Sequence, residues 1–254
     1  MGHARRPVRV DAHRRKRILE RVFPMKGPRL MRDAVTVKHG YTNRTEHRAN
    51  GVRKVYDGPD ADERADAEFR ALSCLAGLFP VPQLIVAGPG TVVTRFVEGD
   101  HGQDLINLGH AHSVLRECGR VLRQLHALDP SLLSERVDDN TVIQHGDFGP
   151  NNIMFDRHTH KVRAVLDWEF SRVGPAITDI AWCEWIVRMH HMNAVRKLSV
   201  FFDAYGTRPT WAERKAEMLR RCAWLEGFSR RWDPNGQGVA TWQQRTKAVA
   251  SWVE

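Results

Sequence analysis

The sequence predicts an α+β fold with two lobes, in which a small antiparallel sheet and one packed helix precede a larger, mostly helical part. Three observations predict it. The 254 residues are enough for two such lobes. Short strand-like runs separated by turn residues occupy residues 34–97, around a single helical segment. Beyond residue 112 the apolar residues recur at helical spacing. We therefore expect an arm with a first helix over residues 1–32, an N-lobe over 33–99 and a C-lobe over 100–254.

In the N-lobe, apolar and polar residues alternate before the helix and again after it. Asn50-Gly51, which separates two of the alternating runs, is a typical hairpin turn. Residues Asp60–Leu78 have one apolar face and acidic residues in the first turn, which predicts a helix. Two more strands should follow, with Glu98–Asp100 as the start of a linker. The strands expected before the helix are Val35–Val37, Thr42–His47 and Val52–Tyr56.

The C-lobe begins with a clear amphipathic pattern that ends near Pro130. A strand-loop-strand segment is expected over residues 142–166, and four further helices near 178–192, 194–205, 211–229 and 240–252. The apolar stripe of the first helix consists of Val114, Leu115, Cys118, Val121, Leu122, Leu125 and His126.

The net charge of +9 is concentrated in the arm, where residues 1–32 contain eleven basic and two acidic side chains. The remaining residues, 33–254, carry 28 of each sign. We interpret the arm as a solvated segment leading into a short helix. Contact with nucleic acid or anionic lipid is an alternative, because such clusters bind phosphates without reading sequence. An organelle transit peptide is the last alternative, since the arm contains no serine.

The amino-acid composition also predicts the cellular compartment of the protein. The four cysteines lie far apart and form no C-x-x-C pair, which favours a reducing environment over a disulfide framework. The longest uncharged run, Ala71–Thr94, is interrupted by prolines and glycines and does not predict a membrane helix. We expect a cytoplasmic protein without a membrane partner.

Residues 142–155 carry the most informative pattern. Asp147 is followed five residues later by Asn152, on a tight Gly/Pro loop between two apolar runs. Asp167 ends another apolar run twenty residues after Asp147, and a turn across Arg157–Lys161 would bring Asn152 and Asp167 together. One acid is then free to meet a substrate hydroxyl, while an Asn and an Asp present oxygens to a hard cation. Phosphoryl transfer with Mg²⁺ needs such an arrangement.

These residues resemble a known family. His145-Gly146-Asp147 with Asn152, followed by Asp167-Trp168-Glu169, is similar to the H-G-D-x-x-x-x-N and D-W-E motifs of aminoglycoside phosphotransferases and choline kinases. The resemblance covers about residues 35–191 and implies a protein-kinase-like fold.

The resemblance also implies roles for individual residues. Asp147 would be the catalytic base or would orient the acceptor hydroxyl, and Asn152 and Asp167 would hold Mg²⁺. The phosphate donor would be ATP or GTP, bound by the N-lobe. The nucleotide-binding residues implied are Gly40, Thr42 and Asn43 in a turn over the phosphates, Lys54 on a strand, and Glu68 on the helix as its partner.

Two departures from the family pattern concern the acceptor side. The loop has Phe148 and Gly149 where relatives often have Leu and His, and the stretch Pro130–Thr141 is short. Residues 180–254 contain 12 basic and 7 acidic side chains, which does not predict the acidic cleft that a polycationic aminoglycoside requires. Candidate acceptor-binding residues are Trp182, Glu184 and Trp185.

We expect a small-molecule kinase that transfers the γ-phosphate of ATP or GTP to a hydroxyl of a small acceptor, with antibiotic inactivation as its leading role. The acceptor would include neutral nucleoside or peptide antibiotics. A metabolic kinase for a sugar, choline-like or amino-acid acceptor is one alternative. A non-catalytic nucleotide-binding regulator is another, but such a protein has no need to keep the five residues Lys54, Glu68, Asp147, Asn152 and Asp167.

Overall fold

The first two described strands form the hairpin that Asn50-Gly51 predicts. β1 (Asn43–Arg48) and β2 (Gly51–Tyr56) pair antiparallel, with Asn43 opposite Tyr56 and Arg48 opposite Gly51. The computed structural model describes residues 43–48 and 51–254. The arm of residues 1–32, with its expected helix, and the strand expected at Val35–Val37 therefore lie outside the described residues.

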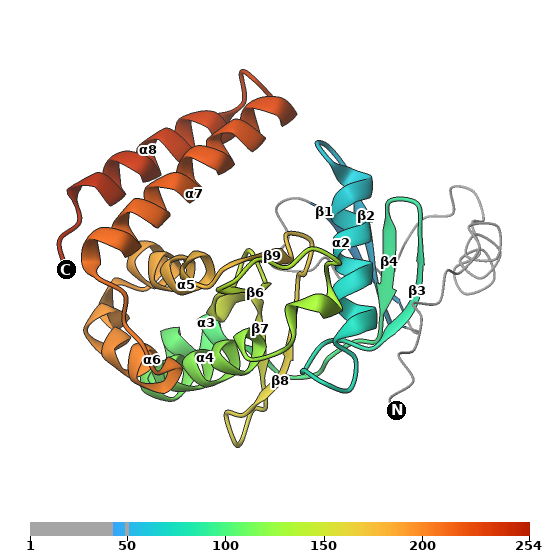
Figure 1. Cartoon of the computed structure of the whole chain (residues 1–254), viewed down its shortest axis with the longest axis horizontal. Coiled ribbons are helices and arrows are strands. Elements are labelled where there is room, and N and C mark those ends of the chain that lie inside the picture. Colours follow the sequence, from blue (N-terminus) through green and yellow to red (C-terminus); the bar gives the residue numbers. More distant parts are fainter. Residues whose placement is uncertain (1–42, 49–50) are drawn as a thin grey trace.

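A four-stranded antiparallel sheet with one packed helix makes up the N-lobe (Figure 1). β3 (Leu84–Gly88) and β4 (Thr91–Thr94) complete the sheet in the order β1-β2-β4-β3. The helix, α2 (Ala61–Cys74), buries Ala71 and Leu72, as its apolar face predicts. It ends four residues before the predicted Leu78, because the chain turns there through Gly77, whose φ of 78° favours glycine.

The chain enters the C-lobe through a short strand instead of a free linker. β5 (Asp100–His101) pairs antiparallel with β7 (Ile153–Phe155), which pairs in turn with β8 (Val162–Val165). The β7–β8 hairpin is the strand-turn-strand expected across Arg157–Lys161. Asp100, where the predicted C-lobe begins, thus already belongs to a strand of its sheet and not to a free linker.

Two helical segments and a long amphipathic helix follow β5. α3 (Gly102–Leu105) and η1 (Ile106–His110) lead into α4 (Ala111–His126). All six apolar residues of the predicted stripe in α4 are fully buried, from Val114 to Leu125, while His126 at its end forms a polar contact described below. This stripe is the centre of a core that continues from the C-lobe into the N-lobe.

The loop that carries Asp147 and Asn152 is flanked by a second pair of strands. β6 (Thr141–Gln144) precedes the loop and pairs antiparallel with β9 (Arg172–Pro175), a strand that periodicity alone did not predict. Two single-turn helices, η2 (Pro130–Leu132) and η3 (Pro150–Asn152), begin with prolines, which fit the first position of a helix.

The four helices expected at the end of the chain are all present. η4 (Met192–Lys197) is a 3₁₀ turn that precedes α6, so the helix expected at 194–205 is α-helical only from Leu198 onward. α7 begins with a capping box between Thr210 and Glu213. α5, α7 and α8 share a second core, which includes Trp182, Trp185 and Cys222. The bounds are α5 (Ile177–His190), α6 (Leu198–Tyr205), α7 (Trp211–Trp232) and α8 (Gln237–Ser251).

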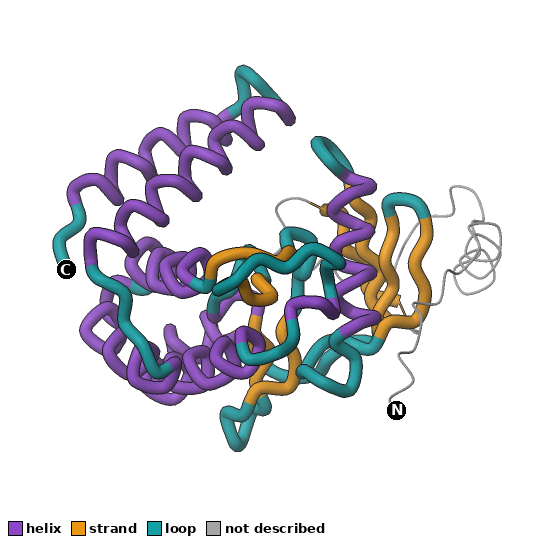
Figure 2. Tube along the Cα trace, in the orientation of Figure 1, coloured by secondary structure: helices purple, strands orange, loops and turns teal. Residues whose placement is uncertain are grey.

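The arrangement confirms the predicted two-lobed α+β fold. Strands gather in the N-lobe and at the junction, and helices dominate the C-lobe (Figure 2). Within the part of the chain that the structure describes, no helix has the length and apolar character needed to cross a membrane. The cysteines are free; Cys118, Cys183 and Cys222 are buried among apolar side chains, and Cys74 is half-buried.

Candidate active site

A deep cleft of about 930 Å³ lies between the two lobes. One end is formed by the sheet of the N-lobe, including Lys54, and by the segment Arg95–Val97 that connects the lobes. The loop with the predicted catalytic residue Asp147 and with Asn152 lies between the two ends. The other end is formed by α5, α7 and α8. The cleft therefore brings residues more than one hundred positions apart into one site.

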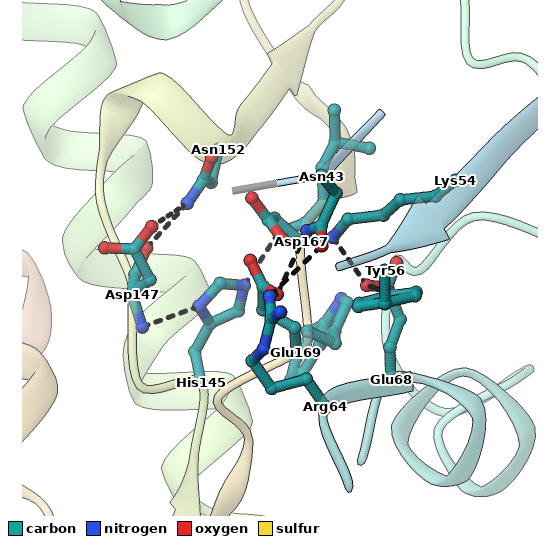
Figure 3. A network of polar contacts seen from close by, with 12 residues as sticks. Asn43, Lys54, Tyr56, Arg64, Glu68, His145, Asp147, Asn152, Asp167 and Glu169 are labelled. Atoms are coloured by element: carbon teal, nitrogen blue, oxygen red, sulfur yellow. Dashed lines mark hydrogen bonds and ion pairs between the residues drawn. The ribbon is translucent and has the colours of Figure 1, made fainter. Parts of the chain in front are cut away.

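Lys54 is the centre of a charged cluster at the N-lobe end (Figure 3). Its ammonium group lies 2.7 Å from the Glu68 carboxylate of α2 and forms a second ion pair with Asp167. The hydroxyl of Tyr56 donates a hydrogen bond to the same Glu68 carboxylate. The cluster joins β2 and α2 of the N-lobe to the loop after β8.

The pairing determines the charge of this cluster. Burial by itself lowers the pKa of Lys54, but the carboxylates of Asp167 and Glu68 outweigh it and hold the pKa well above its usual value. Burial also raises the pKa of Tyr56, and the neighbouring Glu68 carboxylate adds to the rise. Lys54 is therefore a fixed cation, directed by its two carboxylate partners.

Asp167 adopts a left-handed backbone conformation, with φ of 68°. Few residues other than glycine occupy this region, although aspartate tolerates it better than most. The conformation is supported by Trp168, which is fully buried and donates from Nε1 to the carbonyl of Val165 at 2.8 Å. A third of the Asp167 side chain is accessible, so its carboxylate is presented to the cleft.

Glu169 makes a second ion pair across the lobes. Its Oε2 accepts from Arg64 Nη1 at 2.6 Å and from Asn43 Nδ2 at 3.0 Å, and Arg64 also donates to Asn43 at 3.1 Å. The Arg64 and Glu169 side chains are almost fully buried. This triad fastens the start of β1 and α2 to the loop that presents Asp167 (Figure 3).

Asp179 of α5 anchors the start of the loop that carries Asp147. Its carboxylate accepts the backbone N–H groups of His145 and Gly146, both at 2.8 Å, and a hydrogen bond from His126 Nε2 at 3.2 Å. Burial alone would raise the pKa of Asp179, but the hydrogen bond from His126 and the neighbouring histidines keep it below its usual value. Gly146 has φ of 83°, and a Cβ there would lie 2.3 Å from the carbonyl oxygen of Phe170. Glycine is therefore required at this turn.

His145 is fully buried and positions the loop by hydrogen bonding. The backbone N–H of Asp147 donates to its Nδ1 at 3.1 Å, so the proton is on Nε2, which donates to the carbonyl of Leu166 at 2.8 Å. Burial lowers the pKa of His145, which favours this neutral form. The histidine thus links the loop that carries Asp147 to the strand end that carries Asp167.

Asp147 is fixed at both carboxylate oxygens. Trp182 Nε1 donates to Oδ1 at 2.6 Å, and Asn152 Nδ2 donates to Oδ2 at 2.8 Å. Burial raises the pKa of Asp147 to about 7 and the Asp167 carboxylate adds to the rise, while Arg221, Trp182 and Asn152 act against it. Each oxygen keeps a second lone pair, so the carboxylate can still accept a proton or a hydrogen bond from a hydroxyl group.

Asn152 and Asp167 fit the requirements of a magnesium ion that is also bound by phosphates. The two hydrogen bonds of Asn152, to the carbonyl and carboxylate of Asp147, use its amide nitrogen and leave its carbonyl oxygen as an acceptor. Among the described residues no group of three or more His, Cys, Asp or Glu side chains forms a metal cage. Mg²⁺ needs none, because it keeps several waters and uses one or two protein oxygens with substrate phosphates.

Gly149 explains one departure of the loop from the family pattern. A Cβ at this position would lie 2.3 Å from Ile186 Cδ1 of α5 and 2.7 Å from Asn151 Oδ1. The close approach of α5 therefore excludes a histidine here unless Ile186 moves. Asn151 Oδ1 is buried and has no hydrogen-bond partner among the described residues.

The predicted acceptor-binding residues separate into two groups. Trp182 and Trp185 line the cleft. Glu184 points away from it: its carboxylate is 1% accessible and pairs with Arg188 at 2.8 Å and Arg214 at 2.7 Å. The interpretation of Glu184 as an acceptor ligand is corrected by this placement, because on a helix the residues between Trp182 and Trp185 face another side.

The remaining predictions concern the nucleotide-binding turn. Gly40 and Thr42 lie outside the described residues. Asn43 is the first residue of β1, and its side chain bonds Arg64 and Glu169. The roles assigned to Lys54, Glu68, Asp147, Asn152 and Asp167 stay predictions, but the structure gathers all five in the cleft lining.

Sequence reasoning missed four residues that complete the site. Glu169 is the last residue of the Asp167-Trp168-Glu169 motif, so its place in that motif could have identified it. Arg64 and Tyr56 become relevant only through tertiary contacts with Glu169 and Glu68. Arg221 of α7 donates to the carbonyl of Gly146 at 2.6 Å from 75 positions away, and no local pattern marks it.

Comparison with solved structures identifies the fold. The wild-type aminoglycoside 2'-phosphotransferase-IIIa in complex with GDP superposes with a TM-score of 0.69 at 10% identity, over 94% of this chain and 98% of that one. The gentamicin complex of APH(2")-IIa gives 0.67 at 13% identity, over 97% and 98%. APH(4)-Ia in a ternary complex with AMP-PNP and hygromycin B gives 0.64 at 16% identity, over 92% and 96%.

Comparison by sequence adds a short match and a family assignment. A segment of 45 residues is 44% identical to acyl-CoA dehydrogenase family member 11 of Gallus gallus, and this covers 18% of the chain and only 6% of that much longer protein. The model of the phosphotransferase enzyme family (APH) matches residues 33–136 and 131–217, which is most of the chain and includes every predicted catalytic and metal-binding residue. The chain therefore belongs to the phosphotransferase enzyme family.

Proposed function

We propose that this protein is a small-molecule kinase that transfers the γ-phosphate of ATP or GTP to a hydroxyl group of a small acceptor. The observation that carries the proposal is the convergence of Lys54, Asp167, Asn152 and Asp147 on one inter-lobe cleft. A cation, two oxygen ligands for Mg²⁺ and a carboxylate base are the groups that this reaction requires.

In this proposal the nucleotide occupies the N-lobe end of the cleft. Lys54, oriented by Glu68 and Asp167, contacts the phosphates and balances their negative charge. Mg²⁺ held by Asn152 and Asp167 would neutralise charge on the β- and γ-phosphates. Most of the catalytic effect then comes from positioning. Ion pairs fix Lys54, which contacts the phosphates, and hydrogen bonds fix Asp147, which receives the hydroxyl.

Asp147 receives the acceptor. The hydroxyl hydrogen-bonds to its carboxylate, the hydroxyl oxygen attacks the γ-phosphorus, and the bond from that phosphorus to the bridging oxygen breaks. The nucleoside diphosphate leaves, and the hydroxyl proton passes to Asp147 and then to solvent. Trp182 and Asn152 keep the carboxylate aimed during this step. A carboxyl group with a pKa of about 7 accepts a proton more readily than an ordinary aspartate.

Antibiotic inactivation is the biological role we assign to the reaction. It is supported by the family and by the antibiotics named in the structures of the same fold, which hold gentamicin and hygromycin B. Those acceptors belong to those proteins.

The test is a phosphate-transfer screen read by mass spectrometry. Purified protein with Mg²⁺ and either ATP or GTP is offered aminoglycosides, peptide and nucleoside antibiotics, sugars and amino alcohols, with Asp147→Ala as control. A mass gain of one phosphate that the control abolishes would support the proposal. Absence of any nucleotide-dependent rise in melting temperature, together with absence of transfer, would contradict it.

A further inference from the structure

The turn between α7 and α8 lies beyond the core that holds these helices to α5. That core extends along α7 as far as Leu225. Residues 228–238, which we call the hairpin tip, reach the turn between β2 and α2 in the N-lobe (Figure 1). Side chains of the tip line the same cleft as Lys54 and Asp147. The tip is therefore a wall of the cleft that the C-lobe supplies and the N-lobe supports.

Arg231 makes the polar part of this contact. Its guanidinium group donates to both carboxylate oxygens of Asp60, at 2.9 and 2.7 Å. Such a bidentate pair fixes the orientation of the two groups as well as their separation. Both side chains are about half exposed, so water competes with the pair and its contribution to stability is modest. An ion pair of this kind holds two elements together and still lets them separate.

Asp60 is unusual for a residue at the start of a helix. It precedes α2 in the N-cap position, where an aspartate side chain normally accepts a backbone N–H of the first turn. Among the residues that the structure describes, its carboxylate bonds no N–H of α2, and its backbone is left-handed with φ of 55°. The carboxylate is directed to Arg231 instead. The local geometry thus favours the contact with α7 over the stability of α2.

Aromatic side chains of the hairpin tip supply the apolar part of the contact. The indole of Trp232 lies so close to Gly58 that a Cβ there would be 2.6 Å from the ring. The Arg64 guanidinium lies 5.5 Å from the Phe228 ring and 5.8 Å from the Trp232 ring. Arg64 is also the buried partner of Glu169. The tip therefore packs on one of the ion pairs that join the lobes.

The contact lies at the opposite end of β2 from the segment that connects the lobes. Val52, near the start of β2, is paired with Thr94, which directly precedes that segment. Tyr56, at the end of β2, leads into the turn that meets the hairpin tip. Lys54 lies between the two. The tip thus covers the side of the cleft away from the connecting segment, and a ligand that passes there requires the contact to open.

We propose that the hairpin tip is a lid on the cleft, and that Arg231 is the positioning residue that holds it closed on the N-lobe. The lid opens when nucleotide exchanges and, when closed, keeps the C-lobe wall in place against the bound phosphate donor. The inference rests on the proposed function, because it takes the nucleotide to occupy the cleft beside Lys54. The tip lies beyond residue 217, so the family match does not include it.

The release of a fluorescent nucleotide measures how firmly the lid is closed. ATP or GTP carrying an N-methylanthraniloyl group is bound to the full chain with Mg²⁺ and displaced by excess unlabelled nucleotide in a stopped-flow instrument. Arg231→Gln should release it about two- to fivefold faster, because one exposed ion pair is lost. Arg231→Lys keeps the charge without the bidentate geometry, so its release rate should lie between those of Arg231→Gln and the parent.

Arg230→Gln is the matched control. It removes the same charge from the neighbouring residue of α7, where Arg230 pairs with Glu226 of the same helix at 2.7 Å. Nucleotide release should be unchanged in this variant. Asp60→Asn, whose new residue tolerates a left-handed backbone, should accelerate release as well. The double variant Asp60→Asn/Arg231→Gln should release nucleotide no faster than Arg231→Gln, because both changes remove one interaction.

Hydrogen exchange of the backbone amides, measured without nucleotide, reports on the lid itself. The amides of the hairpin tip should exchange faster in Arg231→Gln than in the parent, and at the parent rate in Arg230→Gln. Three results would each overturn the inference: an unchanged release rate in Arg231→Gln, an equal acceleration of release in Arg230→Gln, or unchanged exchange of the hairpin tip in Arg231→Gln.

Failure of the inference can be distinguished from failure of the proposed function. A nucleotide that binds the parent and leaves Arg231→Gln at the same rate overturns the lid and supports the nucleotide site. A parent chain that binds neither nucleotide, with no rise in melting temperature, contradicts the proposed function. The exchange of the hairpin tip needs no nucleotide, so it still shows whether Arg231 holds the tip on the N-lobe.

Discussion

The two ends of the cleft are built in different ways. At the N-lobe end, Lys54, Glu68 and Asp167 form a compact network of ion pairs whose members come from both lobes. At the C-lobe end, the indoles of α5 and α8 stack on one another and a guanidinium group lies over them. We call this end the aromatic chamber and define it by six residues that line the cleft: Trp182, Trp185, Arg221, Phe228, Trp242 and Arg245. The matched family range stops at residue 217, before Arg221, Trp242 and Arg245. The predicted catalytic and metal-binding residues thus lie inside the matched range, whereas the chamber is formed largely by residues beyond that range.

We therefore expect different residues to determine the reaction and the acceptor. Charged groups that stabilise a transferring phosphoryl group must lie in one geometry, and few residue types can supply them. A binding chamber has many solutions, because any rigid surface of the right shape and charge serves. Variants at the two ends should therefore have separable effects, and variants at the junction should affect both.

The largest expected effect is at Asp147, where the two ends meet. Asp147→Asn keeps the shape of the side chain but removes the base, so turnover should fall by about 10²–10⁴-fold. The rise in melting temperature caused by Mg²⁺ and nucleotide should persist, because the Lys54 cluster is untouched. Steady-state kinetics and thermal shift measure the two quantities. Turnover within about threefold of the parent would contradict the assigned role.

The next effect concerns the buried ion pair behind the N-lobe end. Arg64→Met leaves the Glu169 carboxylate buried without its guanidinium partner, so the free energy of unfolding should fall by about 3–5 kcal/mol. Urea denaturation measures the loss. The double variant Arg64→Met/Glu169→Gln removes the uncompensated charge and should recover part of it. A loss of stability below about 1 kcal/mol would show that the pair does not fasten the lobes.

Trp182 tests the coupling between the two ends. Trp182→Phe keeps an aromatic ring in the chamber but removes the N–H that holds Asp147 at 2.6 Å. A hydrogen bond to a charged group contributes about 1.5–3 kcal/mol, so turnover should fall by about 10–100-fold. Trp242→Phe is the matched control, because among the described residues no hydrogen bond joins the Trp242 ring to Asp147. It should change acceptor binding more than turnover. Equal turnover losses in the two variants would contradict the coupling.

The smallest expected effect is at the contact of Gly149 with α5. In Gly149→Ala the new methyl group would lie 2.3 Å from Ile186 Cδ1, the flexible end of that side chain, so Ile186 must leave its rotamer. The free energy of unfolding should fall by about 0.5–1.5 kcal/mol. Ile186→Ala in the same chain should relieve the clash, which a double-mutant cycle would show as an interaction energy. An unchanged free energy of unfolding in Gly149→Ala would show that Ile186 does not constrain the loop.

The sequence predicted more of the N-lobe end than of the chamber, for a physical reason. Alternation and helical periodicity identified the hairpin, α2 and the buried stripe of α4, because these patterns are local. The motif residues Asp147, Asn152 and Asp167 were found by their spacing on short loops. The prediction that Glu184 binds the acceptor was wrong. Which side chains of a helix face the cleft depends on how the helix is oriented in the fold, and a short stretch of sequence does not specify that orientation.

Tertiary packing accounts for the other omissions. Arg64 and Arg221 contact the site residues only because distant elements fold against them. Strand β9 was missed because four residues that include Gly174 and Pro175 carry little strand signal. The tryptophans were expected to fill the helical core, and Trp182 and Trp185 do so; that the same two rings also form a wall of the cleft depends on how α5, α7 and α8 pack.

The central claim is that nucleotide and acceptor meet at Asp147. A crystal structure with AMP-PNP and Mn²⁺ in place of Mg²⁺ tests it most directly, because manganese is located by its anomalous signal. We predict a manganese peak bound by the Asn152 carbonyl oxygen and the Asp167 carboxylate, Lys54 against the phosphates, and the γ-phosphate directed toward Asp147 and the mouth of the aromatic chamber. A nucleotide bound elsewhere, or with its γ-phosphate directed away from Asp147, would contradict the account.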